Sequence, residues 1–439
     1  MKSKTANFIL CFIFLPCTAS TQWFSQNSGT NSILWSTFFA NNDVGWIVYG
    51  DTVIKTTNRG TTWVPSTVGI ATTLTGVYFI DADTGWAVGG NLAGGSAILK
   101  TTDGGLTWKD VSPDVGTFMT GVFFADDRHG WAFGQDGFPG NGRIVATTNG
   151  GTTWTDQPVG SISYLESGFF IDTLTGWAVG ANVILKTTDG GTIWAEQDTE
   201  YTHGPLSVPL HSAFFVNSDM GWVVGGIAWV SVIAKTTDGG QTWTHQIFQP
   251  PTPELDVGRL NWVHFVDDTT GWIVGRVFPG IRELILKTTN GGTTWFRQDT
   301  GIGSQLFSVY FADEKHGWTV GEDGTILATT NGGTTFVRRD NNLPNDSRLL
   351  QNYPNPFNPT TTIEFLLPST SKVRISVYDV TGRLVTILVD DVRTAGLHRV
   401  TFDAAGSASG VYYYDLQAER FSGRAVARLV DVRKMMVVK

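Results

Sequence analysis

The chain has 439 residues, 41% of them hydrophobic and 16% charged, so it can build an apolar core and is not disordered by composition. Its net charge of −9 is uneven, because residues 21–342 carry 16 Lys and Arg against 30 Asp and Glu, whereas residues 343–439 carry 12 against 9. The acidic main part argues against nucleic acid or an anionic membrane as a partner. Many Gly (52) and Trp (17) indicate short strands joined by tight turns.

The N-terminus has the pattern of a secretory signal peptide, predicted over residues 1–20. Two lysines precede a short apolar run, Phe8–Leu15, and small residues suited to cleavage follow at 18–20. The run is too short to span a bilayer, and no other segment is long and apolar enough to do so. Both cysteines, Cys11 and Cys17, lie in this segment, so cleavage leaves no disulfide or Cys-based metal site. Cys17 as a lipid-attachment residue is the alternative.

Two motifs alternate along residues 21–342, seven times each. The first is Gly-Trp, at Gly45-Trp46, Gly85-Trp86, Gly130-Trp131, Gly176-Trp177, Gly221-Trp222, Gly271-Trp272 and Gly317-Trp318. The second is an octet, Thr-x-(Asp/Asn)-x-Gly-x-Thr-Trp, that begins at Thr56, Thr101, Thr147, Thr187, Thr236, Thr288 and Thr329. Repeats with intervals of 40 to 52 residues indicate stacked supersecondary units.

Each unit contains four strand-like runs with no helical stretch. In the second unit these are Leu74–Ile80, Gly85–Gly89, Ala97–Thr102 and Thr107–Val111. Alternating apolar residues and intervening turn residues predict an antiparallel four-stranded blade. Seven such blades close a ring and leave only short sheet edges, so we predict a seven-bladed β-propeller.

The acids and amides of the octet have a structural interpretation: their side chains accept hydrogen bonds from turn amides. They are Asn58, Asp103, Asn149, Asp189, Asp238, Asn290 and Asn331. The Gly two residues later supplies positive φ, and the octet Trp is expected to pack between neighbouring blades. A catalytic or metal-binding role is a poor alternative, because seven copies around a ring cannot serve one site.

The octet resembles the Asp-box (BNR) repeat of sialidases and other propellers. The whole unit, Gly-Trp-x-Val-Gly followed by Leu-Lys-Thr-Thr-Asp-Gly-Gly-x-Thr-Trp, more closely resembles the photosystem II assembly/stability-factor-like propellers, over about residues 30–342. Two octets depart from the pattern, with Ile193 in place of the second Thr and Phe336 in place of the Trp. Either residues 22–29 or Thr335–Asp340 supplies the outer strand that closes the ring, and the sequence leaves both open.

After a predicted linker at 343–350, residues 351–439 contain strand-like runs at 361–367, 373–379, 384–389, 397–402 and 411–417, which predict a small Ig-like β-sandwich. Asn-Tyr-Pro-Asn-Pro-Phe-Asn-Pro at 352–359 and the end motif resemble the type A sorting domain of the type IX secretion system. The sorting-signal residues that match are Lys434, Met435, Val437 and Lys439. The resemblance implies a Bacteroidetes-type bacterium, export to the outer-membrane surface or the medium, and the secretion machinery with its sorting peptidase as partners. A plain carbohydrate-binding module is the alternative.

Connections of uneven length gather on one face of the predicted ring, which makes it the expected binding face. The candidate binding residues in these loops are Phe138, Tyr201, Trp229, Asp256, Arg259, Phe278, Arg282 and Glu283. Packing of each onto the rim is the alternative.

No catalytic constellation, metal-ligand spacing, cofactor motif or phosphate loop is visible in the sequence. The favoured function is therefore non-catalytic binding or scaffolding by a propeller at the cell surface, with an unknown glycan or protein ligand. One alternative is a sialidase- or xyloglucanase-like glycoside hydrolase, for which Asp256 and Glu283 are the loop acids to test. The other is an assembly factor resembling the photosystem II stability factor.

Overall fold

The structure is a computed structural model that describes residues 23–70, 72–91, 95–113, 116–137, 140–197, 208–227, 230–246, 258–277, 282–298, 300, 302–333, 347–367, 370–394, 396–420 and 428–438. The chain divides into two compact units, residues 1–334 and 335–439. The predicted signal peptide lies outside the described residues. Within the described ranges, no helix has the length and apolar character needed to cross a membrane.

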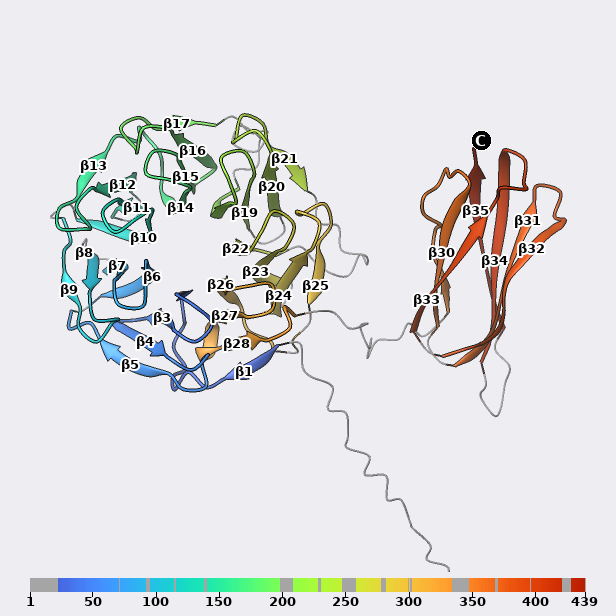
Figure 1. Ribbon diagram of the computed structural model, residues 1–439, viewed down its shortest axis with the longest axis horizontal. Coiled ribbons are helices and arrows are strands. Elements are labelled where there is room, and N and C mark those ends of the chain that lie inside the picture. The colour runs from blue at the N-terminus through green and yellow to red at the C-terminus, as the bar shows by residue number, and fades with distance from the viewer. Residues whose placement is uncertain are drawn as a thin grey trace, which may run out of the picture. The chain divides into compact units, whose positions relative to one another are not determined.

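The described part of the first unit contains seven antiparallel four-stranded sheets, numbered here in chain order (Figure 1). Sheet 1 contains β2 (Ser36–Phe39), β3 (Gly45–Tyr49), β4 (Thr52–Thr56) and β5 (Val64–Thr67). Sheet 2 contains β6 (Thr73–Phe79), β7 (Gly85–Asn91), β8 (Gly95–Thr101) and β9 (Lys109–Asp110). Sheet 3 contains β10 (Thr117–Phe124), β11 (Gly130–Asp136), β12 (Gly142–Thr147) and β13 (Thr155–Gln157). Sheet 4 contains β14 (Leu165–Phe170), β15 (Gly176–Gly180), β16 (Val183–Thr187) and β17 (Ala195–Glu196).

The last three sheets follow the same order of strands. Sheet 5 contains β18 (Leu210–Phe215), β19 (Gly221–Ile227), β20 (Val230–Thr236) and β21 (Thr244–Gln246). Sheet 6 contains β22 (Leu260–Phe265), β23 (Gly271–Val277), β24 (Arg282–Thr288) and β25 (Phe296–Gln298). Sheet 7 contains β26 (Leu306–Phe311), β27 (Gly317–Gly321), β28 (Ile326–Thr329) and, from the other end of the unit, β1 (Phe24–Gln26), with a short helix η1 (Glu322–Gly324) between β27 and β28.

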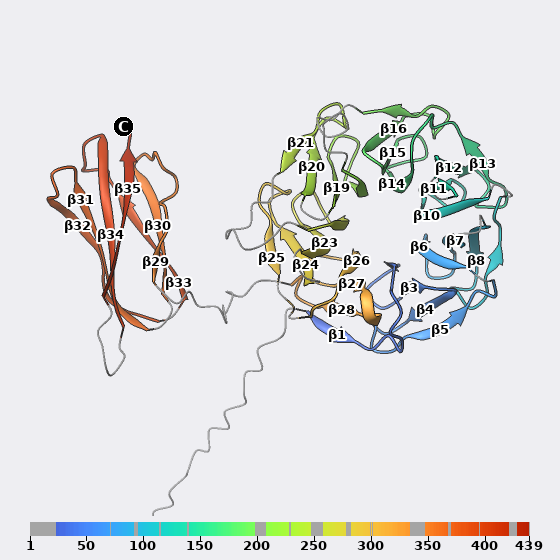
Figure 2. The same cartoon turned by 180° about the vertical axis from the view of Figure 1, so that it is seen from behind.

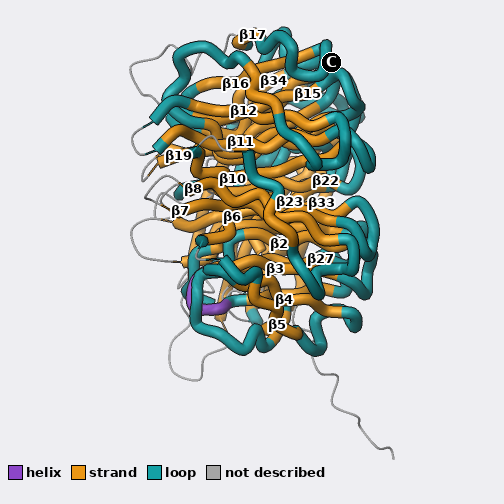
Figure 3. The backbone as a smooth tube through the Cα atoms, turned by 90° about the vertical axis from the view of Figure 1, so that its left-hand side faces the viewer, coloured by secondary structure: helices purple, strands orange, loops and turns teal. Residues whose placement is uncertain are grey.

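The seven sheets stand around a common axis with their first strands innermost (Figures 1 and 2). Each first strand contacts the first strand of the next sheet, and β26 contacts β2. Because antiparallel strands alternate in direction, the connections fall on two opposite faces (Figure 3). The first-to-second turns and the octets share what we call the Gly-Trp face. The second-to-third connections and those between sheets share the other, which we call the variable face.

Neighbouring sheets are held together by stacked aromatic pairs. The Trp of each Gly-Trp motif stacks on a Phe in the first strand of the next sheet, with centroids 3.4–3.6 Å apart; the pairs are Trp46–Phe79, Trp86–Phe124, Trp131–Phe170, Trp177–Phe215, Trp222–Phe265, Trp272–Phe311 and Trp318–Phe39. The octet Trp meets that same Phe edge-on, but from within its own sheet, as Trp108 does with Phe79 at 6.1 Å. The octet Trp also packs against the hydrophobic cluster between two sheets, as Trp108 does with the cluster that contains Trp46 and Phe79. The expectation that it lies between blades is therefore confirmed, and the Gly-Trp residue adds the stacked contact.

The same Phe explains why Gly precedes each of these Trp residues. At Gly85, a Cβ atom would lie 2.4 Å from the ring of Phe79, which belongs to the same sheet. The other six copies are equally crowded. The sandwich of Phe between two Trp residues thus requires a residue without a side chain beneath it.

The residue before each of these Phe side chains forms a second aromatic series, which lines the axis. Consecutive rings around the axis have centroids 4.8–5.0 Å apart, and the series returns to its start; the members are Phe38, Tyr78, Phe123, Phe169, Phe214, His264 and Tyr310. Burial lowers the pKa of His264 to about 4, so the ring is uncharged at neutral pH. We call this series the axial aromatic ring.

Sheet 7 is completed by the N-terminal strand. β1 pairs antiparallel with β28, with Phe24 opposite Ala328. Trp23 lies edge-on to Phe311 at 5.8 Å, in the place that octet Trp residues occupy in the other sheets. Its Nε1 donates to Gln298 Oε1 at 2.8 Å. The first of the two closures left open by the sequence is thus the one formed, and Thr335–Asp340 lies outside the described residues.

The octets form tight hydrogen-bonded hairpins. Asn149 Oδ1 accepts from the Thr153 amide at 2.9 Å and from the Thr147 hydroxyl, while its Nδ2 donates to the Thr153 hydroxyl at 2.8 Å. Asp103 and Asp238 accept the same amide hydrogen bond, and they accept from the Thr107 and Thr242 hydroxyls rather than donating to them. These hydrogen bonds hold the pKa values of both acids at about 2.

The octet acid or amide should behave as a structural acceptor. We expect Asn149→Asp to leave stability nearly unchanged, because sheets 2, 4 and 5 already carry Asp there. Asn149→Ala should lower the free energy of unfolding by about 1 kcal/mol, because the Thr153 amide loses its acceptor. Chemical denaturation of both variants checks this; equal losses in the two would contradict it.

The second unit packs two sheets around one core. The smaller sheet contains β29 (Arg348–Leu349), β30 (Thr360–Leu367) and β33 (Gly396–Asp403). The larger contains β32 (Leu384–Arg393), β31 (Ser371–Asp379), β34 (Gly410–Arg420) and β35 (Arg428–Val437), in that spatial order. The predicted linker at 343–350 includes β29, whose Leu349 is part of the core.

The two motifs of the second unit, at 352–359 and 434–439, lie side by side although they are far apart in sequence. The Phe357 amide donates to the Met436 carbonyl at 3.0 Å, and the Val438 amide donates to the Phe357 carbonyl at 3.0 Å. Of the predicted sorting-signal residues, Met435 and Val437 are buried in the core, Lys434 is exposed, and Lys439 is outside the described residues. The end motif is therefore also the last strand of a folded unit.

Candidate functional site

In six of the seven sheets, the first strand contains a β-bulge near its beginning. The extra residues are Thr75, Thr120, Glu166, His211, Asn261 and Phe307. Trp35 has the corresponding place in sheet 1, where its ring contacts Phe307 at 4.8 Å. Bulges redirect side chains, and these lie where the innermost strands begin, so this series belongs to the axial region of the variable face.

Three of these side chains tie one sheet to the next. Thr75 Oγ1 donates to the Met119 carbonyl at 2.8 Å, and Thr120 Oγ1 donates to the Leu165 carbonyl at 2.9 Å. Asn261 Nδ2 donates to the carbonyl at the same position in sheet 7. A hydrogen-bond donor at the bulge is therefore part of how the ring is built.

Glu166 departs from this pattern, because a carboxylate cannot donate to the next sheet. Instead it lies among His211 of sheet 5 and Arg259 of sheet 6. An Arg259 guanidinium nitrogen lies 3.4 Å from His211 Nδ1, which in turn lies 3.9 Å from Glu166 Oε1. The three side chains form what we call the axial cluster, which spans sheets 4 to 6.

Burial and mutual charge set the ionisation of the axial cluster. Burial raises the pKa of Glu166, and the positive charge of Arg259 only partly opposes this. Burial, together with Arg259, lowers the pKa of His211 to about 3, so His211 is neutral at pH 7. Its Nε2 lies 3.2 Å from the Gly226 carbonyl and donates to it, which leaves Nδ1 as an acceptor facing Arg259.

The cluster has capacity left for a ligand. Arg259 Nε is buried and has no hydrogen-bond partner among the described residues. The same holds for Asn261 Oδ1, in the strand β22 that begins directly after Arg259. The Glu166 side chain is 31% exposed. A guanidinium donor beside a carboxylate acceptor matches the acceptor and donor of an amide group or the hydroxyls of a sugar.

Among the described residues, the structure brings only one predicted binding residue, Arg259, into the cluster. Glu283 is buried, 4% exposed, and its carboxylate accepts from the Thr300 hydroxyl at 3.0 Å. Arg282 begins β24 opposite Val277, and its side chain is not described. The remaining five candidates lie outside the described residues: Phe138, Tyr201, Trp229, Asp256 and Phe278.

Glu166 and His211 were missed by the sequence reasoning. Their position in the repeat has no fixed residue type, because Trp, Thr, Glu, His, Asn or Phe occupies it, always directly after a buried Leu or Met. A charged residue at this position of the repeat marks the sheets where the ring departs from its regular pattern.

No group of three or more His, Cys, Asp or Glu residues within the described ranges is arranged to hold a metal ion. In the same ranges, Glu166 is the only carboxylate of the axial cluster. Hydrolysis of a glycosidic bond ordinarily requires two.

Four-stranded antiparallel sheets around an axis, with the first strand of each innermost, are the arrangement of a β-propeller. Solved structures with this fold include YCF48 bound to D1 peptide, with 20% identity, a TM-score of 0.55, and coverage of 71% of this chain and 97% of that chain. YCF48 from Cyanidioschyzon merolae is also 20% identical, with a TM-score of 0.55 and coverage of 70% and 98%. The GH74 xyloglucanase from Xanthomonas campestris is 13% identical, with a TM-score of 0.55 and coverage of 78% of this chain but 59% of that chain.

Two protein families match parts of the chain. Residues 351–429 match the secretion system C-terminal sorting domain. Residues 163–254 and 201–301 match the photosynthesis system II assembly factor YCF48 family. Both resemblances expected from the motifs are confirmed. No curated protein sequence matches the chain significantly.

Proposed function

We propose that this chain is an exported, non-catalytic, seven-bladed β-propeller that binds an extended peptide segment of another protein at its axial cluster. The observation that carries the proposal is the buried Arg259 guanidinium, which has a donor that no described residue uses and interacts with the partly exposed carboxylate of Glu166. Together they offer a donor and an acceptor to a peptide group. A solved relative in fold, YCF48, binds a peptide, which supports this ligand class.

The second unit serves export in this proposal. The match to the sorting-domain family supports passage to the cell surface or the medium, with the secretion machinery and its sorting peptidase as partners. We propose an Ig-like sandwich for this unit, followed by its removal or surface attachment. The negative charge of residues 21–342 and the proposed export from the cell argue against a role in photosystem assembly. Co-purification with photosystem subunits would restore that alternative.

A peptide array probed with the full-length protein identifies ligands, and titration calorimetry then measures their affinity. We expect Arg259→Met and Glu166→Gln each to weaken binding by about tenfold or more, because a buried charged partner is lost. Arg143→Met in sheet 3 is the matched control, since Arg143 pairs with Asp136 and Asp156 away from the cluster. Equal affinity in the Arg259 variant and the wild type would contradict the proposal.

A glycoside hydrolase is the second candidate, favoured by one observation. The raised pKa of Glu166 is the property that a general acid needs. Release of sugars from xyloglucan by the wild type, and its loss in Glu166→Gln, would establish this function in place of simple binding.

A further inference from the structure

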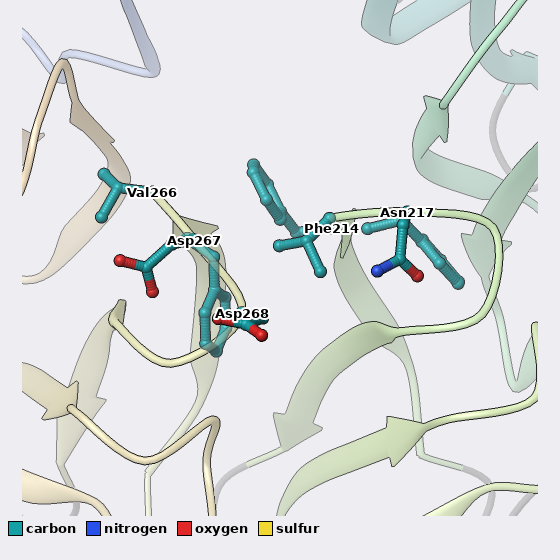
Figure 4. A pocket seen from close by; sticks show the side chains of 8 residues that line it. Phe214, Asn217, Val266, Asp267 and Asp268 are labelled. Carbon is teal, nitrogen blue, oxygen red and sulfur yellow. The ribbon is translucent and has the colours of Figure 1, made fainter.

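A cavity lies on the Gly-Trp face, between sheets 5 and 6 (Figure 4). Its volume is about 420 Å³. One wall comes from the first-to-second turn of sheet 5 and the other from the same turn of sheet 6; the lining residues are Phe214, Phe215, Val216, Asn217, Phe265, Val266, Asp267 and Asp268. Phe214, a member of the axial aromatic ring, is half-buried, so part of it remains available to a ligand.

Sheet 6 carries two consecutive acids in this turn, and sheets 3 and 7 have acid pairs at the same place. In those two sheets a histidine contacts the first acid: His129 Nδ1 lies 2.9 Å from Asp126, and His316 Nδ1 lies 2.8 Å from Asp313. A cation, Arg128 or Lys315, also directly precedes each histidine. The turns of sheets 3 and 7 therefore place basic side chains next to their acid pairs.

The turn of sheet 6 has threonines in place of these basic residues. Asp267 Oδ1 accepts from the amides of Thr269 and Thr270 at 2.7 and 2.6 Å, so this carboxylate is held by its own turn. Asp268 makes no hydrogen bond or ion pair with any described residue. Lys235 lies within electrostatic reach of Asp268, but its Nζ donates to the Gly291 carbonyl at 2.9 Å.

We propose that this pocket binds an organic cation, an ammonium or guanidinium group, with Asp268 as its counter-ion and Phe214 as its aromatic wall. A cation beside an aromatic ring is attracted to it, and a carboxylate at the rim adds a charge that the turn leaves uncompensated. Metal ions fit less well, because they prefer a fuller set of oxygen ligands than two carboxylates and apolar walls provide.

The surroundings of the pocket favour the same charge. The seven first-to-second turns of this face contain eleven Asp and Glu against two Lys and Arg. Such a surface raises the local concentration of cations and speeds their arrival. The cation has two sources, a free small molecule or a Lys or Arg side chain of a partner protein, and the chemistry of the pocket is the same for both.

Titration of the full-length protein with choline and agmatine, followed by saturation-transfer NMR at low ionic strength, tests the pocket. We expect both cations to bind and 3,3-dimethylbutanol, the neutral counterpart of choline, to bind at least tenfold more weakly. Asp268→Asn should weaken cation binding by about tenfold, whereas Asp127→Asn, at the equivalent position of sheet 3, should have no effect. Phe214→Leu should weaken it severalfold, with Phe123→Leu as its control.

A further arm distinguishes the two sources. Tighter binding of a lysine-containing tripeptide than of agmatine assigns the pocket to a protein side chain, and the reverse assigns it to a free cation. Equal binding of choline and its neutral counterpart would overturn the proposal, and so would equal weakening by Asp268→Asn and Asp127→Asn. Because the axial cluster lies on the other face, Arg259→Met should leave cation binding unchanged, which separates this inference from the proposed function.

Discussion

Trp177→Ala should lower the free energy of unfolding of the first unit by about 3–5 kcal/mol, the range for removal of a large buried aromatic side chain. Trp177 is fully buried and stacks on Phe215 of the next sheet at 3.5 Å. Its Nε1 donates to the Gly239 carbonyl at 3.3 Å, and Lys186, whose Nζ lies 5.3 Å from the ring centre, donates to the same carbonyl at 2.7 Å. One substitution thus removes the stack, a hydrogen bond and a cation–π contact.

Denaturation followed by tryptophan fluorescence measures this loss in the full-length chain. All 17 tryptophans precede residue 319, so the signal reports the first unit alone. Trp177→Phe is the graded control, because it keeps an aromatic stack and should cost about half as much or less. A loss below 1 kcal/mol for the Ala variant would show that the stacks do not hold neighbouring sheets together.

Trp23→Ala should lower the free energy of unfolding by a similar amount, although Trp23 lies outside the repeat. Trp23 is 5% exposed and is the only described tryptophan edge-on to Phe311. Removal opens a cavity beneath the closing strand and leaves Gln298 Oε1 without its donor.

The same fluorescence assay tests the closure of the ring. Phe24→Ala is the matched control, since Phe24 is 38% exposed and should matter little. If Trp23→Ala left the denaturation midpoint unchanged, the N-terminal strand would not be what closes sheet 7. The alternative segment, Thr335–Asp340, would then be the one to vary.

The repeat predicted the strands of the first unit well, because Gly-Trp and the octet mark fixed turns. In sheet 2 the predicted run Leu74–Ile80 corresponds to Thr73–Phe79. The fourth strand, predicted over Thr107–Val111, is only Lys109–Asp110. Strict alternation also fails: Trp46, Ile47 and Val48 are all fully buried, because neighbouring sheets cover both faces of a second strand. In the second unit, β35 was missed because its motif was interpreted only as a signal.

The candidate site was predictable only in part. Arg259 was selected because it lies in an uneven loop, and the variable face is where it meets Glu166. The partners of Arg259 come from bulges in two other sheets, and a bulge has no fixed residue type that a single sequence reveals. The axial aromatic ring likewise depends on closure around an axis, which joins Phe38 of the first repeat to Tyr310 of the last.

The pairing of β1 with β28 in sheet 7 also determines how the ring responds to a pulling force. Phe24, at the beginning of β1, lies opposite Ala328, near the end of β28. The chain therefore enters β1 and leaves β28 at the same end of the paired strands. A force applied through these two exits loads the three paired positions one after another rather than together. The ring should therefore open first at this sheet, while the stacked pairs between the other sheets still hold.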